Sequence, residues 1–158
     1  MCLLRQGTKL STFYPSSGVN WFLSDRDSAY LILHPQESLC FIGTTQLQVV
    51  RGSINLLGVT LSTSPTVHPV FAPRSHPLPV ITAVSHPGNP IGTDLPNEII
   101  KHCGPSDSVI LLRVHRTGVE GLGEVCRIFE NIFHGPKATP SLECMLEGFH
   151  PVLYPRST

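Results

Sequence analysis

Short apolar stretches separated by turn residues follow one another along most of the chain. Four of these stretches contain four or five residues and are flanked by residues such as Gly, Pro and Ser, a pattern typical of β-strands. They cover residues 19–23, 29–33, 39–42 and 80–84. Between the second and third stretches, His34-Pro35-Gln36-Glu37 predicts a turn, because proline fixes φ and cannot continue a strand ladder. A nearly continuous apolar run at 109–114 indicates a further strand, buried on both faces.

Residues 47–61 carry the most informative pattern in the chain. Apolar side chains occupy odd positions at first, then even positions, then odd positions again: Leu47 and Val49, Ile54 and Leu56, Val59 and Leu61. Each change falls at a glycine, first Gly52 and then Gly58. Because strand side chains alternate between two faces, an uninterrupted change would turn the core face outward. We therefore predict a hairpin turning at Arg51-Gly52 and a bulge or corner near Gly58.

Helical spacing is clearest near the end of the chain, from about residue 118 to 133. Apolar residues recur there every three or four positions, as on one face of a helix: Val119, Leu122, Val125, Cys126, Phe129, Ile132 and Phe133. Thr117 and Glu120 have the spacing of a capping box, and Gly135-Pro136 provides a stop. Residues 97–103 are compatible with two further helical turns. Repeated prolines predict extended or looped chain at 62–79, and a loop is expected at 85–96.

Together these patterns predict a mainly β fold. We expect a β-sandwich or partly open barrel of about seven short strands, with one C-terminal amphipathic helix. The expected organisation is a flexible lead-in at 1–18, a β-rich domain at 19–135 and a linker at 136–158.

Composition narrows the possible functions. Eleven basic and eleven acidic residues cancel, and charged residues make up only 14% of the chain. Little direct nucleic-acid binding is therefore expected, because such domains usually carry a basic excess. Apolar runs fall far short of the roughly 20 residues that span a bilayer, so no membrane partner is expected. The five cysteines are scattered without CxxC spacing, which indicates reduced thiols in an intracellular protein rather than a zinc site.

Residues with catalytic potential do not form a recognisable constellation. The segment Gly135-Pro-Lys-Ala-Thr-Pro-Ser141 resembles a phosphate-binding loop only superficially, since it lacks the second glycine and the Gly-Lys-Ser/Thr core. Five of the eight histidines precede proline, and no helical metal-binding pair occurs. We therefore expect no catalytic, cofactor-binding or metal-binding residue in this chain.

A longer stretch carries a family resemblance. Residues 47–61, with the segment 67–81 that contains Ala72-Pro73 and Leu78-Pro79, resemble the N-terminal region of the polynucleotide 5′-hydroxyl kinases of ribosomal RNA processing, most of all the fungal branch. Residues 10–15, 30–39 and 117–126 are similar to the same family. The positions that carry the pattern are Arg51, Gly52, Gly58, Pro73, Pro79, Thr117 and Glu120.

The resemblance implies a β-rich domain that packs on a P-loop kinase domain. In that family the kinase domain uses ATP and Mg²⁺ to phosphorylate RNA 5′-hydroxyl ends. Those ends are made by a partner endonuclease during pre-rRNA spacer processing in the nucleolus of the nucleus. The present sequence reaches Thr158 where the kinase domain would begin, so no catalytic residue is carried over, and we expect the chain to be inactive alone. The alternative is a stand-alone β-sandwich interaction module without enzymatic activity.

The accessory-domain hypothesis predicts an exposed apolar surface where a kinase domain would sit. Two segments are candidates for this surface, the strand at 109–114 and the helix at 119–133.

Overall fold

The computed structural model describes residues 12–25, 27–41, 43–72, 76–85, 95–115, 118 and 122–129. Within these ranges the chain forms nine strands, two short α-helices and one turn of 3₁₀ helix. The strands are β1 (Trp21–Asp25), β2 (Ser28–Leu33), β3 (Ser38–Cys40), β4 (Gly43–Arg51), β5 (Ser53–Leu56), β6 (Val59–Ser62), β7 (His68–Ala72), β8 (Val80–Val84) and β9 (Ser108–Val114). The helices are α1 (Asn97–His102), α2 (Leu122–Val125) and the 3₁₀ turn Arg127–Phe129.

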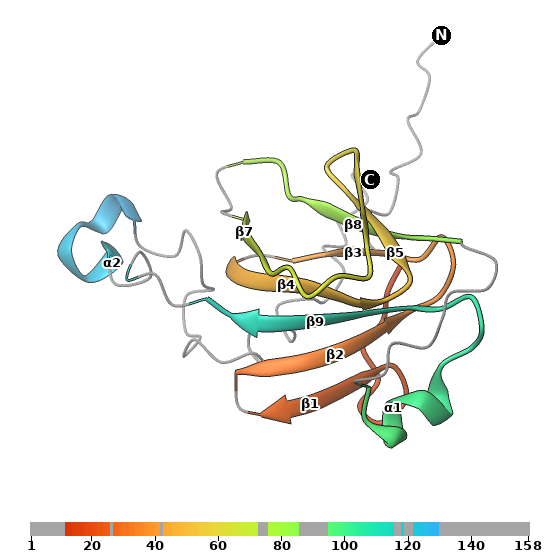
Figure 1. Ribbon diagram of the computed structural model, residues 1–158. Helices are drawn as coiled ribbons and strands as arrows, with labels where there is room; N and C mark the ends of the chain where they lie inside the picture. The colour runs from red at the N-terminus through yellow and green to blue at the C-terminus, as the bar shows by residue number, and fades with distance from the viewer. Residues whose placement is uncertain are drawn as a thin grey trace, which may run out of the picture.

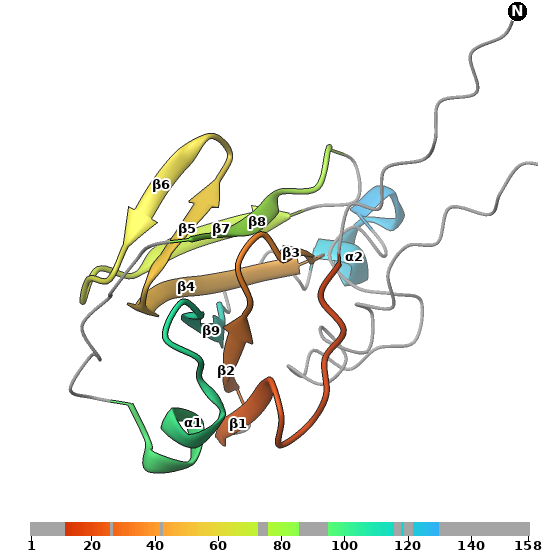
Figure 2. The ribbon, with the colours of Figure 1, turned by 90° about the vertical axis from the view of Figure 1, so that its right-hand side faces the viewer.

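Two antiparallel sheets form the body of the molecule (Figure 1). The first has the strand order β1-β2-β9-β4-β7, and the second has the order β3-β8-β5-β6. The second view shows the β5–β6 hairpin at one end of the molecule (Figure 2). The predicted class, a mainly β fold of the sandwich or partly open barrel type, is confirmed. We count two more strands than expected, because β6 and β7 are distinct short elements in the described chain.

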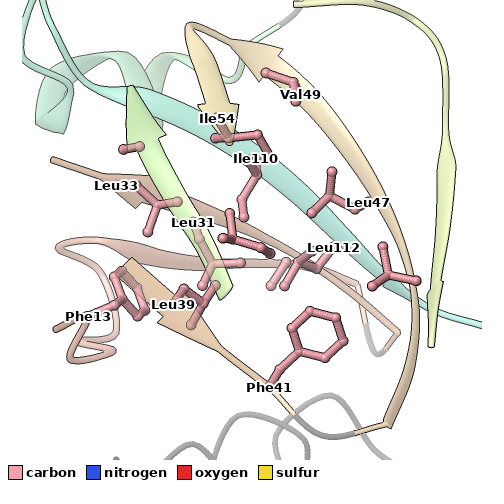
Figure 3. Packing of buried hydrophobic residues seen from close by; sticks show 14 of the residues in the cluster. Phe13, Leu31, Leu33, Leu39, Phe41, Leu47, Val49, Ile54, Ile110 and Leu112 are labelled. Atoms are coloured by element: carbon pink, nitrogen blue, oxygen red, sulfur yellow. The ribbon is translucent and has the colours of Figure 1, made fainter. Parts of the chain in front are cut away.

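The main core lies between the two sheets (Figure 3). Apolar side chains fill it from both sides, including Leu31, Leu33, Leu39, Phe41, Leu47, Val49, Ile54, Ile110 and Leu112. Phe13 also enters this core and is only 1% exposed. The backbone N–H groups of Thr12 and Phe13 donate to the Ser38 carbonyl at 2.8 and 2.9 Å. Thr12 and Phe13 therefore pack against the two-sheet domain, ahead of Val19 in the chain.

A smaller core covers the opposite face of the first sheet. Ile32, Val109, Leu95 and Ile99 are buried together there, beneath α1. Because β9 contributes Val109 to this cluster and Ile110 to the main core, its neighbouring side chains are buried on opposite faces of the sheet. This confirms the interpretation of the apolar run at 109–114, and the helix predicted at 97–103 is confirmed as α1.

The chain changes sheets at Gly52, and the predicted hairpin at Arg51-Gly52 is wrong. β4 pairs with β7 and β9, whereas β5 pairs with β6 and β8, so the strands on either side of Gly52 belong to different sheets. The β4–β9 register also shifts between Val49 and Arg51, which is where the facing of the side chains changes. A glycine with φ +79° allows this sharp corner.

The tight hairpin turn lies instead at Leu57-Gly58, between β5 and β6, where a bulge or corner had been predicted. Leu56 pairs with Val59, which leaves a two-residue loop. Both loop residues have positive φ, +53° for Leu57 and +83° for Gly58, as a type I′ turn requires. Both glycines at which the strands are interrupted were thus predicted correctly, but the hairpin and the corner were assigned to the wrong ones. The face to which side chains point changes at a corner as well as at a hairpin, so the pattern does not distinguish the two.

Other boundaries differ by small amounts. β1 begins two residues later than predicted, at Trp21, and the turn predicted at His34–Glu37 is present, with the Glu37 N–H donating to the His34 carbonyl at 2.9 Å. The proline-rich stretch 62–79 contains β7, in which Pro69 occupies a strand at the edge of the sheet. Proline is tolerated there because an edge strand has no partner on its outer side.

Within the described residues, the predicted C-terminal helix is shorter than expected. Gly118 has φ +82° and lies outside any helix, α2 covers Leu122–Val125, and the 3₁₀ turn follows at Arg127–Phe129. The capping pair Thr117 and Glu120, and positions 130–133, lie outside the described residues. In the part of the chain that the structure describes, no helix is long and apolar enough to cross a membrane.

Candidate functional site

The space between the sheets is filled by apolar side chains (Figure 3). Over the described ranges, no group of three or more His, Cys, Asp and Glu side chains is placed to hold a metal ion. The buried charged residues of these ranges, Arg51 and Asp107, are each 5% exposed. They lie at one end of the first sheet, where β4 ends and β9 begins, and they define the first candidate site.

Arg51 is the last residue of β4, which places it at this end of the first sheet. Its Nη2 donates to the Pro105 carbonyl at 3.4 Å, and its buried Nε has no hydrogen-bond partner among the described groups. Its positive charge also acts on Cys103, where it opposes the larger effect of burial, and the net result is a raised pKa for the thiol. A thiol with a raised pKa is poorly ionised and therefore a weak nucleophile.

Asp107 connects two loops. Its Oδ2 accepts a hydrogen bond from the Gly104 N–H at 2.7 Å, and its Oδ1 lies 3.0 Å from Nδ1 of His34. The hydrogen bond to Asp107 raises the pKa of His34 above its ordinary value, and the nearby charges of Asp107 and Glu37 act in the same direction. The ion pair therefore fastens the β2–β3 turn to the loop between α1 and β9.

Ser108 connects the two sheets beside this cluster. Its hydroxyl donates to the Ser53 carbonyl at 2.9 Å and accepts from the Ser53 N–H at 3.3 Å. These bonds satisfy buried backbone groups at the corner, which would otherwise destabilise the fold. Asp107, Ser108 and the Nη2 group of Arg51 thus hold neighbouring segments together.

This cluster does not fit a nucleotide phosphate or Mg²⁺. Asp107, the one buried carboxylate within the described ranges, already accepts two hydrogen bonds from the chain itself. The Arg51 guanidinium is directed at a backbone carbonyl. We therefore interpret the cluster as a structural support for the corner and derive no chemical step from it.

The second candidate site is an exposed apolar surface on α2 and the 3₁₀ turn. We call it the C-terminal stripe and define it as Leu122, Val125, Ile128 and Phe129. Val125 and Ile128 are 86% and 82% exposed, and Leu122 and Phe129 are 41% and 45% exposed. The helix lies apart from the two sheets at the far left of Figure 1. An exposed apolar cluster of this kind is typical of a surface that binds another protein.

Only one of the two segments proposed to carry an exposed apolar surface does so. β9 lies between β2 and β4, and its residues from Ser108 to Leu112 are buried, so the strand at 109–114 does not form such a surface. The apolar residues of the C-terminal helix, in contrast, are exposed where the structure describes them.

The residues singled out in the sequence fall into separate places. Arg51 and Gly52 stand together at the corner, Gly58 lies in the β5–β6 turn, and Pro79 is buried directly before β8. Pro73, Thr117 and Glu120 lie outside the described residues. Asp107 and Ser108 were not predicted from the sequence, although an Asp three residues after a loop glycine can stabilise the loop by accepting a hydrogen bond from its N–H, as Asp107 does from Gly104.

The fold and both candidate sites define a class: a two-sheet antiparallel β domain with a polar corner that supports its structure and an exposed apolar stripe. Residues 20–137 match the family described as the N-terminal domain of polynucleotide 5′-hydroxyl-kinase NOL9. The chain belongs to this family of N-terminal domains, as the resemblance in the sequence had indicated.

Curated relatives lead to the same family. The chain is 35% identical over 123 residues to the polynucleotide 5′-hydroxyl-kinase GRC3 of Cryptococcus neoformans var. neoformans serotype D, a match that covers 74% of this chain and 14% of the relative. It is 31% identical over 117 residues to grc3 of Aspergillus terreus, covering 73% and 12%. A shorter match to grc3 of Emericella nidulans is 38% identical over 66 residues and covers 42% and 8%. The chain thus matches only a small part of each relative's length.

Proposed function

We propose that this chain is an N-terminal accessory domain of a polynucleotide 5′-hydroxyl kinase and is not catalytic by itself. Its membership of the family of N-terminal domains, over residues 20–137, is the observation that carries the proposal. The relatives that contain the matching region are named as polynucleotide 5′-hydroxyl-kinases. Asp107, Ser108 and the Nη2 group of Arg51 make structural hydrogen bonds to the chain itself, which supports an accessory rather than a catalytic role.

In this proposal the chemistry belongs to a separate kinase part. ATP and Mg²⁺ bind that part, and the γ-phosphate is transferred to the 5′-hydroxyl of RNA. The biological setting that we propose is pre-rRNA spacer processing in the nucleolus of the nucleus, with the RNA end supplied by a partner endonuclease. The even charge balance of the chain supports little direct contact with RNA.

The C-terminal stripe is the surface that we propose for contact with the kinase part. Val125 and Ile128 stand largely in solvent, and covering such side chains stabilises a complex by about 25 cal/mol for each Å² of apolar area removed from water. The fully buried centre of a protein interface is typically depleted in charge and rich in apolar residues, and the four residues of the stripe have that character.

Reconstitution tests this function. The Cryptococcus neoformans relative, with its matching N-terminal region removed, is assayed for phosphate transfer from ATP to a 5′-hydroxyl oligoribonucleotide, with and without the present chain. We expect no transfer by the chain alone, and binding to the shortened relative accompanied by increased activity or stability. Transfer by the purified chain alone, or absence of binding to the shortened relative, would contradict the proposal.

A further inference from the structure

Four strands lie at the ends of the two sheets, and an unprotected end strand is able to pair with another chain. In the first sheet the end strands are β1 and β7, and in the second they are β3 and β6. Proteins commonly protect such edges with proline, charge, a bulge or a covering segment. The four edges of this domain differ sharply in this respect.

Three of the four edges are protected. The β3 edge is covered by Thr12 and Phe13, whose N–H groups donate to the Ser38 carbonyl. β7 contains Pro69, which has no N–H to offer. β1 ends in Asp25, has a register irregularity, and has its first residue engaged by the preceding turn, where the Trp21 N–H donates to the Ser16 carbonyl at 3.2 Å.

The fourth edge, β6, has none of these protections within the described ranges. Val59–Ser62 contains no proline and no charge, and its pairing with β5 is regular. From Gly52 to Val67 the sequence has no acidic, basic or histidine residue. Val59, Thr60 and Ser62 are exposed, with Val59 at 59%. The hairpin that carries this edge extends from the upper left of the molecule in Figure 2.

The register shows which backbone groups face outward. A two-residue loop makes Leu56 and Val59 a hydrogen-bonded pair. The Thr63 N–H donates to the Gly52 carbonyl at 3.1 Å, which continues the same alternation at the other end of the strand. Val59, Leu61 and Thr63 therefore bond toward β5. The N–H and C=O groups of Thr60 and Ser62 point away from it, and no backbone bond outside the strand pairings involves them within the described ranges.

We propose that the β6 edge binds the same edge of a second copy of this chain, in an antiparallel arrangement around a two-fold axis at Leu61. This register pairs Thr60 with Ser62 of the other copy, and Ser62 with its Thr60, through their outward N–H and C=O groups. Leu61 faces its counterpart across the axis. Two copies meet here without repulsion, because the hairpin is uncharged and the chain has a formal net charge of zero.

The proposed contact buries little surface area, and its affinity is therefore low. A four-residue strand and a hairpin tip fall below the roughly 1,200 Å² that a stable complex buries, so the association is weak and concentration-dependent. The exposed Leu57, at 75%, stands at the tip of the same hairpin and adds apolar area. This inference does not depend on the C-terminal stripe or on the proposed kinase partner.

Sedimentation equilibrium of the 158-residue chain over a range of concentrations tests the proposal. We expect the average mass to rise from 17.3 kDa toward twice that value. Val59→Lys and Thr60→Pro remove apolar area and one outward N–H, respectively, and we expect both to abolish the rise. Leu23→Lys is the matched control, because Leu23 lies on the β1 edge and is 50% exposed; this variant is expected to dimerise normally.

Amide hydrogen exchange of the unaltered chain provides a readout that does not depend on whether the variants fold. At high concentration, the amides of Thr60 and Ser62 are expected to become protected, whereas those of Val59 and Leu61 are protected throughout. A mass of 17.3 kDa at every concentration would overturn the proposal. So would association that persists in both β6 variants, or protection of Thr60 and Ser62 only when a kinase part is added.

Discussion

Gly52 lies so close to Ser108 that no side chain fits at position 52. A Cβ atom built there would stand 2.9 Å from the Ser108 Cα and 2.6 Å from its Oγ. This contact brings the corner between the sheets against the start of β9, where Ser108 bonds to both backbone groups of Ser53. The junction of the two sheets therefore depends on a glycine and a serine that meet at close range.

The first prediction concerns this contact. Gly52→Ala combines an unfavourable positive φ with overlap against Ser108 backbone, so we expect a loss of about 2–5 kcal/mol in the free energy of unfolding. Urea denaturation followed by circular dichroism measures it.

Gly58→Ala is the matched control for the close contact. Gly58 has a similar φ of +83°, but nothing lies within 4 Å of a Cβ at that position. Only the backbone strain remains, and the expected loss is about 1–2 kcal/mol. Equal losses for the two variants would contradict the role assigned to the Gly52–Ser108 contact.

The second prediction concerns Leu57, which has φ +53° and is 75% exposed. A leucine in this conformation is strained, whereas asparagine adopts it readily in type I′ turns. Leu57→Asn should therefore raise the free energy of unfolding by up to about 1 kcal/mol. The thermal unfolding midpoint provides the measurement, and a clear decrease would show that the Leu57 side chain stabilises the isolated domain.

The third prediction concerns the ion pair between His34 and Asp107. The pKa of His34 is raised above 6.5 in the folded chain, chiefly by its hydrogen bond to Asp107. A raised histidine pKa stabilises the fold below the unfolded-state value, and this contribution is lost as pH rises through the folded-state value. Stability from this pair is therefore complete below about pH 6.5 and declines above it. Because the His34 side chain is 61% exposed, the contribution stays within about 1 kcal/mol.

His34→Asn should remove this part of the pH dependence. Urea denaturation of both proteins across the same pH series measures the difference in unfolding free energy. The control is His102→Asn, which removes a different histidine. The ring centroid of His102 lies 5.4 Å from that of Phe22. If the His34 variant keeps the full pH dependence, the ion pair does not contribute as described.

Much of the fold could be predicted from side-chain patterning. Strands with one buried face show period-two alternation, and β9 shows a continuous apolar run because α1 and the second sheet cover opposite faces of its sheet. The exchange of roles between Gly52 and Gly58 could not be resolved in this way. Both a corner and a hairpin change the facing of side chains, and only the pairing of distant strands distinguishes them.

The candidate sites were predicted less completely. The apolar spacing around Leu122 and Val125 indicated a stripe, but periodicity does not report whether a stripe is covered or exposed. Asp107 and His34 are 73 positions apart and meet through tertiary structure. Such a pair leaves no local pattern in the sequence, and neither does the contact between Ser108 and Gly52.

The fourth prediction concerns the C-terminal stripe as the docking surface of an accessory domain. In Val125→Asp combined with Ile128→Asp, two side chains that are 86% and 82% exposed become charged. Little stability is lost in the isolated chain, because exposed positions contribute little to folding. Binding to a kinase part should fall at least tenfold, since each buried, unpaired carboxylate is costly at an interface.

Isothermal titration of the chain into the shortened Cryptococcus neoformans relative measures this binding most directly. We expect a saturable one-to-one complex with the unaltered chain, and a loss of affinity for the doubly substituted chain at unchanged thermal stability. Equal affinity of the two chains would contradict the stripe as the docking surface. Absence of any binding by the unaltered chain would contradict the accessory-domain function itself.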